Sequence, residues 1–284
     1  MIFRARQFEY RFPRPALVMG VVNVTPDSFS DGGKYFNPAA AIAHALELVA
    51  QGAGILDIGG ESTRPGAAPV AEAEELQRVV PVISQLVPQI KIPISIDTTK
   101  PAVARAALAA GASIVNDVSG NLDPDALWRV VADFQAGYVC MHARGGPAAG
   151  PTSPAYADVV REVGEFFSGR LEALLNRAGV LPEQVVLDVG IGFGKSQEHN
   201  LELLANLLIF MRLRRPLLLG VSRKSFIGKL LGSEVNQRLP ASLACATLAV
   251  ASGGHIIRTH DVAETVQAVR MTEALLSRRI NHHG

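Results

Sequence analysis

The sequence predicts a (β/α)8 barrel, in which eight parallel strands form a closed ring inside a layer of helices. Eight short apolar runs alternate with helical stretches along the 284 residues, and this alternation is typical of repeated βαβ units. Almost every apolar run stops at a polar residue or a glycine that opens a loop. Since the carboxyl ends of all strands in such a barrel open onto one face, the residues at these stops should share one pocket. In chain order the stops are Asn23, Gly59-Gly60, Asp97, Asn116-Asp117, His142, Asp188, Ser222 and Arg258.

The expected elements follow one another along the chain. Residues 1–15 alternate apolar and charged side chains at period two, which predicts a short hairpin that closes the amino end of the barrel. The first barrel strand, 16–22, is wholly apolar, as a strand covered on both faces should be. The other strands are expected at 55–58, 94–97, 113–117, 138–141, 185–188, 217–221 and 255–258. Helices are expected at 38–51, 71–87, 101–110, 124–135, 155–178, 197–212, 223–231 with 241–252, and 262–279.

A single domain is expected over residues 1–284, because no linker divides the chain. Within it, residues 1–15 form the hairpin and residues 280–284 are expected to be a flexible tail. A doubly wound open sheet is the rival architecture. The eight units and the absence of G-x-G-x-x-G after the first strand favour the barrel.

Composition narrows the class of protein. The formal net charge is +1 and 48% of the residues are apolar, which argues against a nucleic-acid binder. The two cysteines have no partner at metal-ligand or C-x-x-C spacing. The first residues lack the apolar core of a signal peptide, and no apolar run approaches the ~20 residues needed to cross a bilayer. We therefore expect a cytoplasmic protein without nucleic-acid or membrane partners.

Four strand tips carry groups suited to a flat heterocycle. They are the carboxylates, amide and ammonium of Asp97, Asp188, Asn116 and Lys224. A carboxylate can accept two adjacent N–H donors side by side, as it does from an arginine. Asp188 is therefore the candidate that would accept both N–H donors of an aminopyrimidinone edge. In the alternative interpretation, Asp57, Asp97 and Asp188 only satisfy backbone N–H groups at the strand ends.

The last strand and the first carry groups suited to phosphate. Phosphate sites in these barrels often use the last strands and a helix N-terminus, where Arg258 and His260 offer positive charge and N–H donors. Across the barrel closure, Asn23 offers an amide oxygen to a Mg2+ ion held mainly by diphosphate and water. Two glycine-bearing polar loops, 23–33 and 59–66, could cover an anion there or be simple turns.

The loops after the sixth and seventh strands complete the expected pocket. The glycine run 190–194 with Lys195 lacks the spacing and the Lys-Ser/Thr ending of a P-loop, so we expect it to approach a flat ligand closely, with Phe193 as a wall. Ser222 falls at an expected helix N-cap, where a carboxylate could also bind. Lys224 follows it, and in an aldolase such a residue would be a Schiff-base lysine.

Taken together, eight motifs in register resemble the dihydropteroate synthases. The resemblance runs from about residue 16 to residue 275. Its motifs are 23–33, 61–66, 97–101, Asn116-Asp117, Met141-His142 with Gly145 and Pro147, 188–195, 222–228 and 258–262. Two positions depart from the family pattern: Val189 stands where proline is usual, and Arg144 where a neutral residue is common.

The resemblance implies a transferase of folate biosynthesis that condenses 6-hydroxymethyl-7,8-dihydropterin diphosphate with 4-aminobenzoate, giving 7,8-dihydropteroate and diphosphate. It also implies a Mg2+ cofactor, sulfonamide inhibitors and a homodimer. It assigns the pterin to Asp97, Asn116, Met141, Asp188, Gly192, Phe193 and Lys224. It assigns the diphosphate to Asn23, Thr63, Arg258 and His260, and the metal to Asn23. It assigns 4-aminobenzoate to Thr63, Arg64, Pro65, Phe193, Ser222 and Lys224, and catalytic roles to Asp97, Lys224, Arg258 and His260.

The implied reaction breaks the C–O bond to diphosphate. Negative charge then collects on the leaving group, beside Mg2+, Arg258 and His260. Positive charge collects on the pterin methylene carbon, where the ring and nearby carboxylates can stabilise it. The weakly basic aniline nitrogen is an adequate nucleophile for such a cation, so no strong general base is expected.

Two alternatives share the barrel. A pterin-binding methyltransferase domain would have no use for a diphosphate site. The phosphate-binding side chains of Arg258 and His260 therefore argue against it. A catalytically silent paralogue could bind pterin for regulation or assembly, although the intact loops after the first two strands favour an enzyme.

Overall fold

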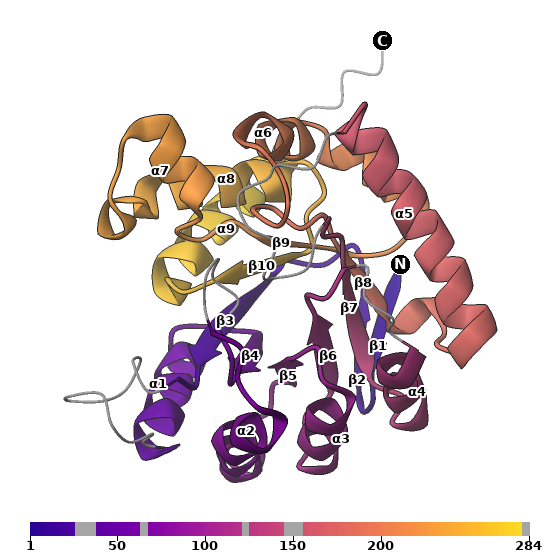
Figure 1. Ribbon diagram of the computed structural model, residues 1–284. Helices are drawn as coiled ribbons and strands as arrows, with labels where there is room; N and C mark the ends of the chain where they lie inside the picture. Colours follow the sequence, from indigo (N-terminus) through magenta and orange to yellow (C-terminus); the bar gives the residue numbers. More distant parts are fainter. Residues whose placement is uncertain (26–37, 63–67, 121–124, 145–155, 280–284) are drawn as a thin grey trace.

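The strands close into one parallel barrel surrounded by helices (Figure 1). The computed structural model describes residues 1–25, 38–62, 68–120, 125–144 and 156–279. Around the ring the strands follow the order β10-β3-β4-β5-β6-β7-β8-β9, and every neighbouring pair is parallel. The predicted (β/α)8 architecture is therefore confirmed.

Each barrel strand lies where the apolar runs predicted it. The bounds are β3 Leu17–Asn23, β4 Ile55–Gly59, β5 Ile94–Asp97, β6 Ile114–Asp117, β7 Gly137–Met141, β8 Val185–Asp188, β9 Leu217–Gly220 and β10 Ile256–Thr259. All of these strands are buried along most or all of their length, because helices cover the outside of the ring and side chains fill its inside.

The helices alternate with the strands as expected, and most differ from the predicted bounds by one to three residues, but two of them differ by more. The bounds are α1 Pro38–Ala50, α2 Glu72–Leu86, α3 Pro101–Ala109, α4 Asp125–Asp133, α5 Val159–Ala173, α6 Gln197–Ala205, α7 Ser225–Leu231, α8 Leu239–Ala251 and α9 Val262–Leu276. The expected helix 197–212 stops at Ala205, because Asn206 leaves helical geometry and a 3-10 helix, Leu207–Leu213, follows. The expected helix 155–178 starts only at Val159, after the N-cap Asp158, and ends in a π-helical turn.

The N-terminal hairpin closes the amino end of the barrel, as predicted. Its strands, β1 Ile2–Ala5 and β2 Phe8–Arg11, pair antiparallel. Phe3 and Ala5 are fully buried in one cluster with residues from the lower part of the ring. The Arg6 guanidinium donates to the carbonyls of Leu108 and Ala112, both at 2.8 Å. The hairpin thus seals the end opposite the strand tips.

Side chains inside the ring form two layers, because alternate residues of a strand face the same side. The lower layer packs against the hairpin and is apolar: Met19, Ile55, Ile114, Val139, Val186, Leu218 and Ile256. Two residues further along the same strands, the next inward positions carry Val21, Asp57, Asn116, Met141, Asp188, Gly220 and Arg258. The strand period therefore places a largely polar layer directly above an apolar one, at the carboxyl end of the barrel.

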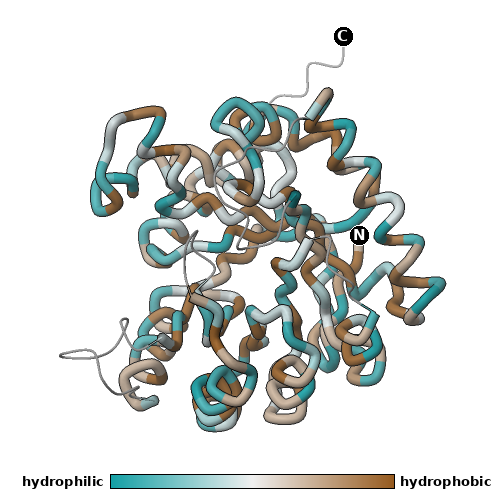
Figure 2. Tube along the Cα trace, in the orientation of Figure 1, coloured by the Kyte–Doolittle hydropathy of each residue, from teal (hydrophilic) through white to brown (hydrophobic). Residues whose placement is uncertain are grey.

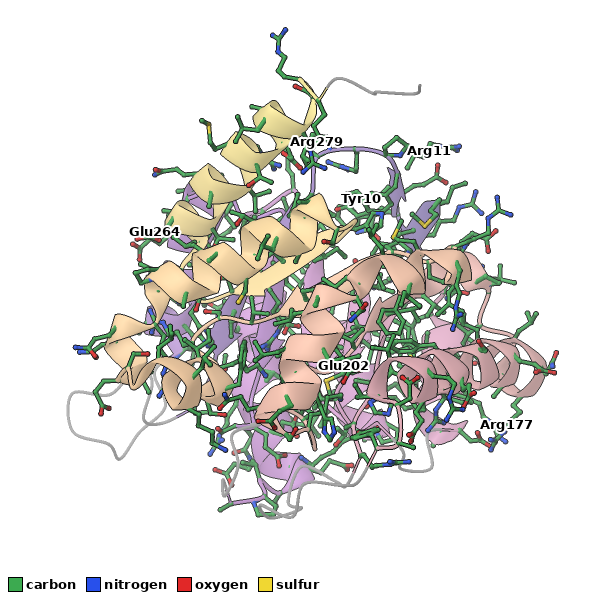
Figure 3. The ribbon with its side chains drawn as sticks, turned by 90° about the horizontal axis from the view of Figure 1, so that it is seen from above. Tyr10, Arg11, Arg177, Glu202, Glu264 and Arg279 are labelled. Carbon is green, nitrogen blue, oxygen red and sulfur yellow. The ribbon has the colours of Figure 1, made fainter. Side chains whose placement is uncertain are left out.

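Apolar residues concentrate along the strands, whereas polar residues colour much of the helical surface (Figure 2). Seen from above, charged side chains such as Arg177, Glu264 and Arg279 lie at the periphery of the molecule (Figure 3). Of the two cysteines, Cys140 is buried and Cys245 packs partly buried against the core, as small hydrophobes would. Within the described residues, no helix combines the length and apolarity that a membrane span requires.

Candidate active site

Arg258 lies at the centre of the polar layer and is held by two carboxylates. Its Nε donates to Oδ2 of Asp57 at 2.6 Å, and its Nη2 donates to Oδ2 of Asp97 at 2.7 Å. The Asn116 amide donates to the same Asp57 oxygen at 3.0 Å. These contacts join β10, β4, β5 and β6. Among the described residues, Nη1 of Arg258 has no hydrogen-bond acceptor, which leaves it available for an external anion.

Two of the three aspartates do more than satisfy strand-end N–H groups. Asp57 and Asp97 bind the Arg258 guanidinium, so the structural interpretation considered for them is wrong. For Asp188 that interpretation is partly correct, because its Oδ1 accepts the Gly190 N–H at 2.8 Å. Within the described part of the chain its Oδ2 has no donor, so one carboxylate oxygen of Asp188 can still accept from a ligand.

Burial moves the pKa values of two charged groups toward neutrality. The pKa of Asp97 is raised to about 7, chiefly by burial, and the attraction of Arg258 is opposed by the charges of Asp57 and Glu75. The pKa of Lys224 is lowered to about 8, again chiefly by burial and then by the charge of Arg258. Groups poised near neutral pH in a strand-tip pocket are typical of active sites.

An apolar wall adjoins Asp188. Met141 is its register partner in β7 and belongs to a small cluster with Val118, Ala143 and Phe193. The Lys224 ammonium lies 4.2 Å from the centroid of the Phe193 ring, within the range of a cation–π contact. A Cβ placed on Gly192 would be 3.3 Å from Cδ of Lys224. The glycine run therefore approaches Lys224 closely and presents Phe193 as a wall, as its sequence predicted.

Ser222 and His260 are bonded to each other between the β9 and β10 tips. The Ser222 hydroxyl accepts the His260 backbone N–H at 3.2 Å and lies 3.1 Å from His260 Nδ1. The N-cap role expected for Ser222 is wrong, because α7 begins at Ser225 after Lys224. Next to this pair, Arg223 is tied to the Asp261 carboxylate by two hydrogen bonds. Ser222 and His260 are thus held together by hydrogen bonds, close in sequence to Lys224 and Arg258.

Four assigned residues stand apart from this described cluster. Thr63, Arg64 and Pro65 lie outside the described residues, as do the loop positions 26–33, so their contacts stay predictions. Asn23 ends β3, which pairs with β10 on one side and β4 on the other. The ring therefore brings Asn23 to the strand that carries Arg258, although no described contact joins the two side chains.

Sequence reasoning missed the functional importance of Asp57. This residue is fully buried, and it binds both Arg258 and Asn116 through one oxygen. A signal was present: Asp57 lies two residues after Ile55, so it shares the inward face of an otherwise apolar strand. A carboxylate at such a position requires a partner, and the partner comes from a strand 201 residues away.

Comparison with known proteins agrees with this arrangement. Residues 19–260 match the family model described as pterin binding enzyme. Dihydropteroate synthase from Escherichia coli (strain K12) is 47% identical over 264 residues, which are 93% of each chain. The chain belongs to the dihydropteroate synthase family. Membership removes the aldolase interpretation of Lys224.

Solved dihydropteroate synthases share the fold over nearly the whole chain. The Yersinia pestis enzyme in complex with a sulfonamide drug superposes with a TM-score of 0.90 at 43% identity, covering 98% of this chain and 100% of that one. The Xanthomonas albilineans enzyme with 4-aminobenzoic acid gives a TM-score of 0.89 at 45% identity, covering 98% and 99%.

The two departures from the family pattern have structural settings. Val189 is 1% exposed and packs into the main core cluster, so its side chain faces away from the polar layer. Arg144 pairs with Glu162 at 3.0 Å and lies over the Tyr156 ring at 4.5 Å. These contacts give Arg144 a place in the packing of α5 against the β7 loop.

Proposed function

We propose that the protein condenses 6-hydroxymethyl-7,8-dihydropterin diphosphate with 4-aminobenzoate, releasing diphosphate and forming 7,8-dihydropteroate. The observation that carries the proposal is Arg258, held between Asp57 and Asp97 with one guanidinium nitrogen still available for an anion. Asn116, Asp188 and Lys224 surround this group with polar atoms suited to a pterin. The known relatives supply the substrate class: one is named in complex with a sulfonamide drug and another with 4-aminobenzoic acid.

The pterin is proposed to lie between Asp188 and Asn116. The Asp188 carboxylate would accept the adjacent N–H donors of the aminopyrimidinone edge, while the Asn116 amide oxygen accepts from the ring. Met141 and Phe193 would pack against the ring faces, since they form the apolar wall beside Asp188. Lys224 would donate to the pterin carbonyl and contact the second substrate.

The second substrate is proposed to approach along Lys224 and Phe193. The aniline nitrogen attacks the methylene carbon directly, and the carboxylate of 4-aminobenzoate lies near the Ser222 hydroxyl, stabilised by the positive charge of Lys224. The Ser222 hydroxyl is already bonded to His260, so its part is to orient that histidine as much as to touch the ligand. Thr63, Arg64 and Pro65 stay predicted contacts of this subsite.

The proposed chemistry follows from the charges. As the C–O bond breaks, the Arg258 guanidinium and the N–H donors of His260 stabilise the departing diphosphate, since groups already in place need no rearrangement during the reaction. The methylene carbon gains positive charge at the same time. Asp57 and Asp97 place two carboxylates against a single guanidinium, and this excess of negative charge stabilises the developing cation.

A magnesium ion fits the diphosphate end of this site. The described residues hold no group of three acidic, histidine or cysteine side chains that could form a metal cage, but the Asn23 amide oxygen is a hard donor of the kind that Mg2+ accepts. When bound there, the ion would neutralise the leaving group. We expect EDTA to lower turnover at least ~10-fold and excess MgCl2 to restore it. Binding of 6-hydroxymethylpterin, which has no diphosphate, should be unchanged by EDTA; turnover that resists chelation would contradict the assignment.

The pH dependence of pterin binding should be bell-shaped. Below about 7 the Asp97 carboxylate gains a proton, and above about 8 the Lys224 ammonium loses one. Either change removes a charge that the ligand needs, so affinity should fall by up to ~10-fold per pH unit on each side. Titration calorimetry from pH 5.5 to 9.5 measures this profile. The Lys224→Arg variant should lose the alkaline fall, because a guanidinium keeps its proton; an unchanged alkaline fall in that variant would contradict the role of Lys224.

We also propose that the protein forms a homodimer through α8 and α9. Leu248 on α8 is 67% exposed, and Met271 and Leu275 on α9 are 61% and 62% exposed. Large apolar side chains on neighbouring helices are typical of a surface that another subunit covers. Sedimentation should give the mass of a dimer for the wild type and of a monomer for Leu248→Glu. A monomeric wild type would contradict this. A cytoplasmic location stays a prediction.

The proposed reaction is tested by mixing the purified protein with both substrates and Mg2+. We expect stoichiometric release of diphosphate and 7,8-dihydropteroate, detected by mass spectrometry. The Asp188→Ala variant is the control. Formation of neither product, with pterin bound normally, would favour the silent paralogue.

A further inference from the structure

Lys195 is half-buried, and its ammonium binds three backbone carbonyls. Its Nζ donates to the carbonyl oxygens of Gly190 at 2.9 Å, His142 at 3.0 Å and Phe193 at 3.1 Å. An ammonium group has three protons, so each of them has a partner and none is left for a ligand. Burial lowers the pKa of Lys195 to about 7, with the charge of Asp188 opposing that shift. Because the Lys195 ammonium binds backbone carbonyls, we look for its role in the structure of the site and not in the reaction itself.

The carbonyls that Lys195 binds belong to two backbone segments in close contact. The glycine run, residues 190–194, lies directly on the β7 loop, residues 142–144. A Cβ placed on Gly190 would be only 1.9 Å from the His142 carbonyl oxygen, and one on Gly194 only 1.9 Å from the Arg144 carbonyl oxygen. Both glycines also have positive φ angles, of +69° and +58°. No side chain fits between the segments. Among the described hydrogen bonds, those of the Lys195 ammonium join one segment to the other.

A second residue anchors the other side of the glycine run. Asn200, which is 2% exposed, accepts the Gly192 N–H through Oδ1 at 2.7 Å and donates to the Ser196 carbonyl at 2.6 Å. Gly192 and Phe193 therefore lie between two anchoring side chains, the half-buried Lys195 and the buried Asn200. Gly192 and Phe193 are the residues of the glycine run that lie against Lys224, whose ammonium is 4.2 Å from the centroid of the Phe193 ring.

We propose that Lys195 is a positioning residue, which clamps the glycine run against the β7 loop and thereby sets Phe193 and Lys224 in place for the pterin and 4-aminobenzoate. The inference rests on the proposed function for the identity of those ligands. Lys195 would act on the ligands indirectly, because all three protons of its ammonium are bound to backbone carbonyls. Loss of the clamp frees the carbonyls of His142, Gly190 and Phe193 and lets the wall move away from Lys224.

The test is the Lys195→Met variant, which keeps the apolar stem and removes all three hydrogen bonds. We expect the KM for both substrates to rise at least ~10-fold while kcat changes less than ~3-fold, since a displacement of about 1 Å weakens binding that depends on orientation. Lys229→Met is the matched control, because Lys229 is exposed on α7; its constants should equal those of the wild type. Unchanged KM values in Lys195→Met, or a loss confined to kcat, would overturn the proposal.

Amide hydrogen exchange separates positioning from a direct ligand contact without reference to the reaction. In the ligand-free Lys195→Met variant, the amides of residues 190–194 should exchange at least ~10-fold faster than in the wild type, while those of the barrel strands stay protected. Unchanged exchange in these amides would overturn the clamp. If Lys195→Met does not fold, Lys195→Gln retains an amide donor and should raise both KM values at least ~3-fold; KM values equal to the wild type would overturn the proposal. A wild-type protein that makes no dihydropteroate would instead count against the proposed function and leave the exchange result to judge the clamp.

Discussion

Replacing Arg258 with methionine is expected to lower kcat/KM at least ~1000-fold, the largest effect of any single substitution considered. Removing one preorganised charge from a leaving-group site commonly costs 10²–10³-fold in rate. Here the same change also leaves Asp57 and Asp97 without their cation, since Arg258 binds both of them. Breaking a buried ion pair on one side costs about 3–5 kcal/mol, so stability should fall as well.

A double variant separates these two losses. Adding Asp57→Asn to Arg258→Met removes one of the two stranded carboxylates while keeping the Asn116 contact possible. Denaturant unfolding should show that the double variant regains part of the lost stability. Its turnover should remain as low as that of the single variant, because the charge beside the diphosphate is still missing. If Arg258→Met keeps kcat/KM within tenfold of the wild type, the guanidinium has no part in the departure of diphosphate.

The second large effect is expected for Asp188→Ala. Loss of the carboxylate that accepts the aminopyrimidinone edge should weaken pterin binding by at least ~3 kcal/mol, or roughly 100-fold. The Gly190 N–H also loses its acceptor, which loosens the start of the glycine run. Titration calorimetry with 6-hydroxymethylpterin measures the affinity directly.

Asp133→Ala is the matched control for this variant. Asp133 is an exposed carboxylate at the end of α4 and pairs with Arg105 at the surface. Its substitution should leave pterin affinity unchanged. Retention of wild-type affinity by Asp188→Ala would refute the assignment of Asp188 to the pterin.

Most of the fold was predictable because the barrel repeats one local pattern. Each barrel strand is a largely buried run of four to seven residues, and period-two alternation fixes which of its residues face inward. Helix ends were harder. Asn206 and Gly179 are C-cap residues of the kind that mark a helix end. The apolar pattern alone does not show that a 3-10 helix follows Asn206 or that the turn before Gly179, Leu174–Ala178, is π-helical.

The candidate site was predictable in its membership but less so in its contacts. Asp97, Asn116, Asp188 and Arg258 were expected at the strand tips because each ends an apolar run. The pairing of Arg258 with Asp57 joins residues on opposite ends of the chain, and it depends on the closure of the ring, which local patterns do not describe. Similarly, the sequence shows Lys195 only as the end of a glycine run. Its three partners are backbone carbonyls, which every residue has, so no residue type marks them in the sequence.

A crystal structure of the protein with 7,8-dihydropteroate would show whether the strand tips converge on one ligand. We expect the pterin edge to lie within hydrogen-bond distance of Asp188 and Asn116, and the aminobenzoate ring to contact Lys224 and Phe193. A ligand bound away from Asp188 and Arg258, with their present contacts undisturbed, would contradict this expectation.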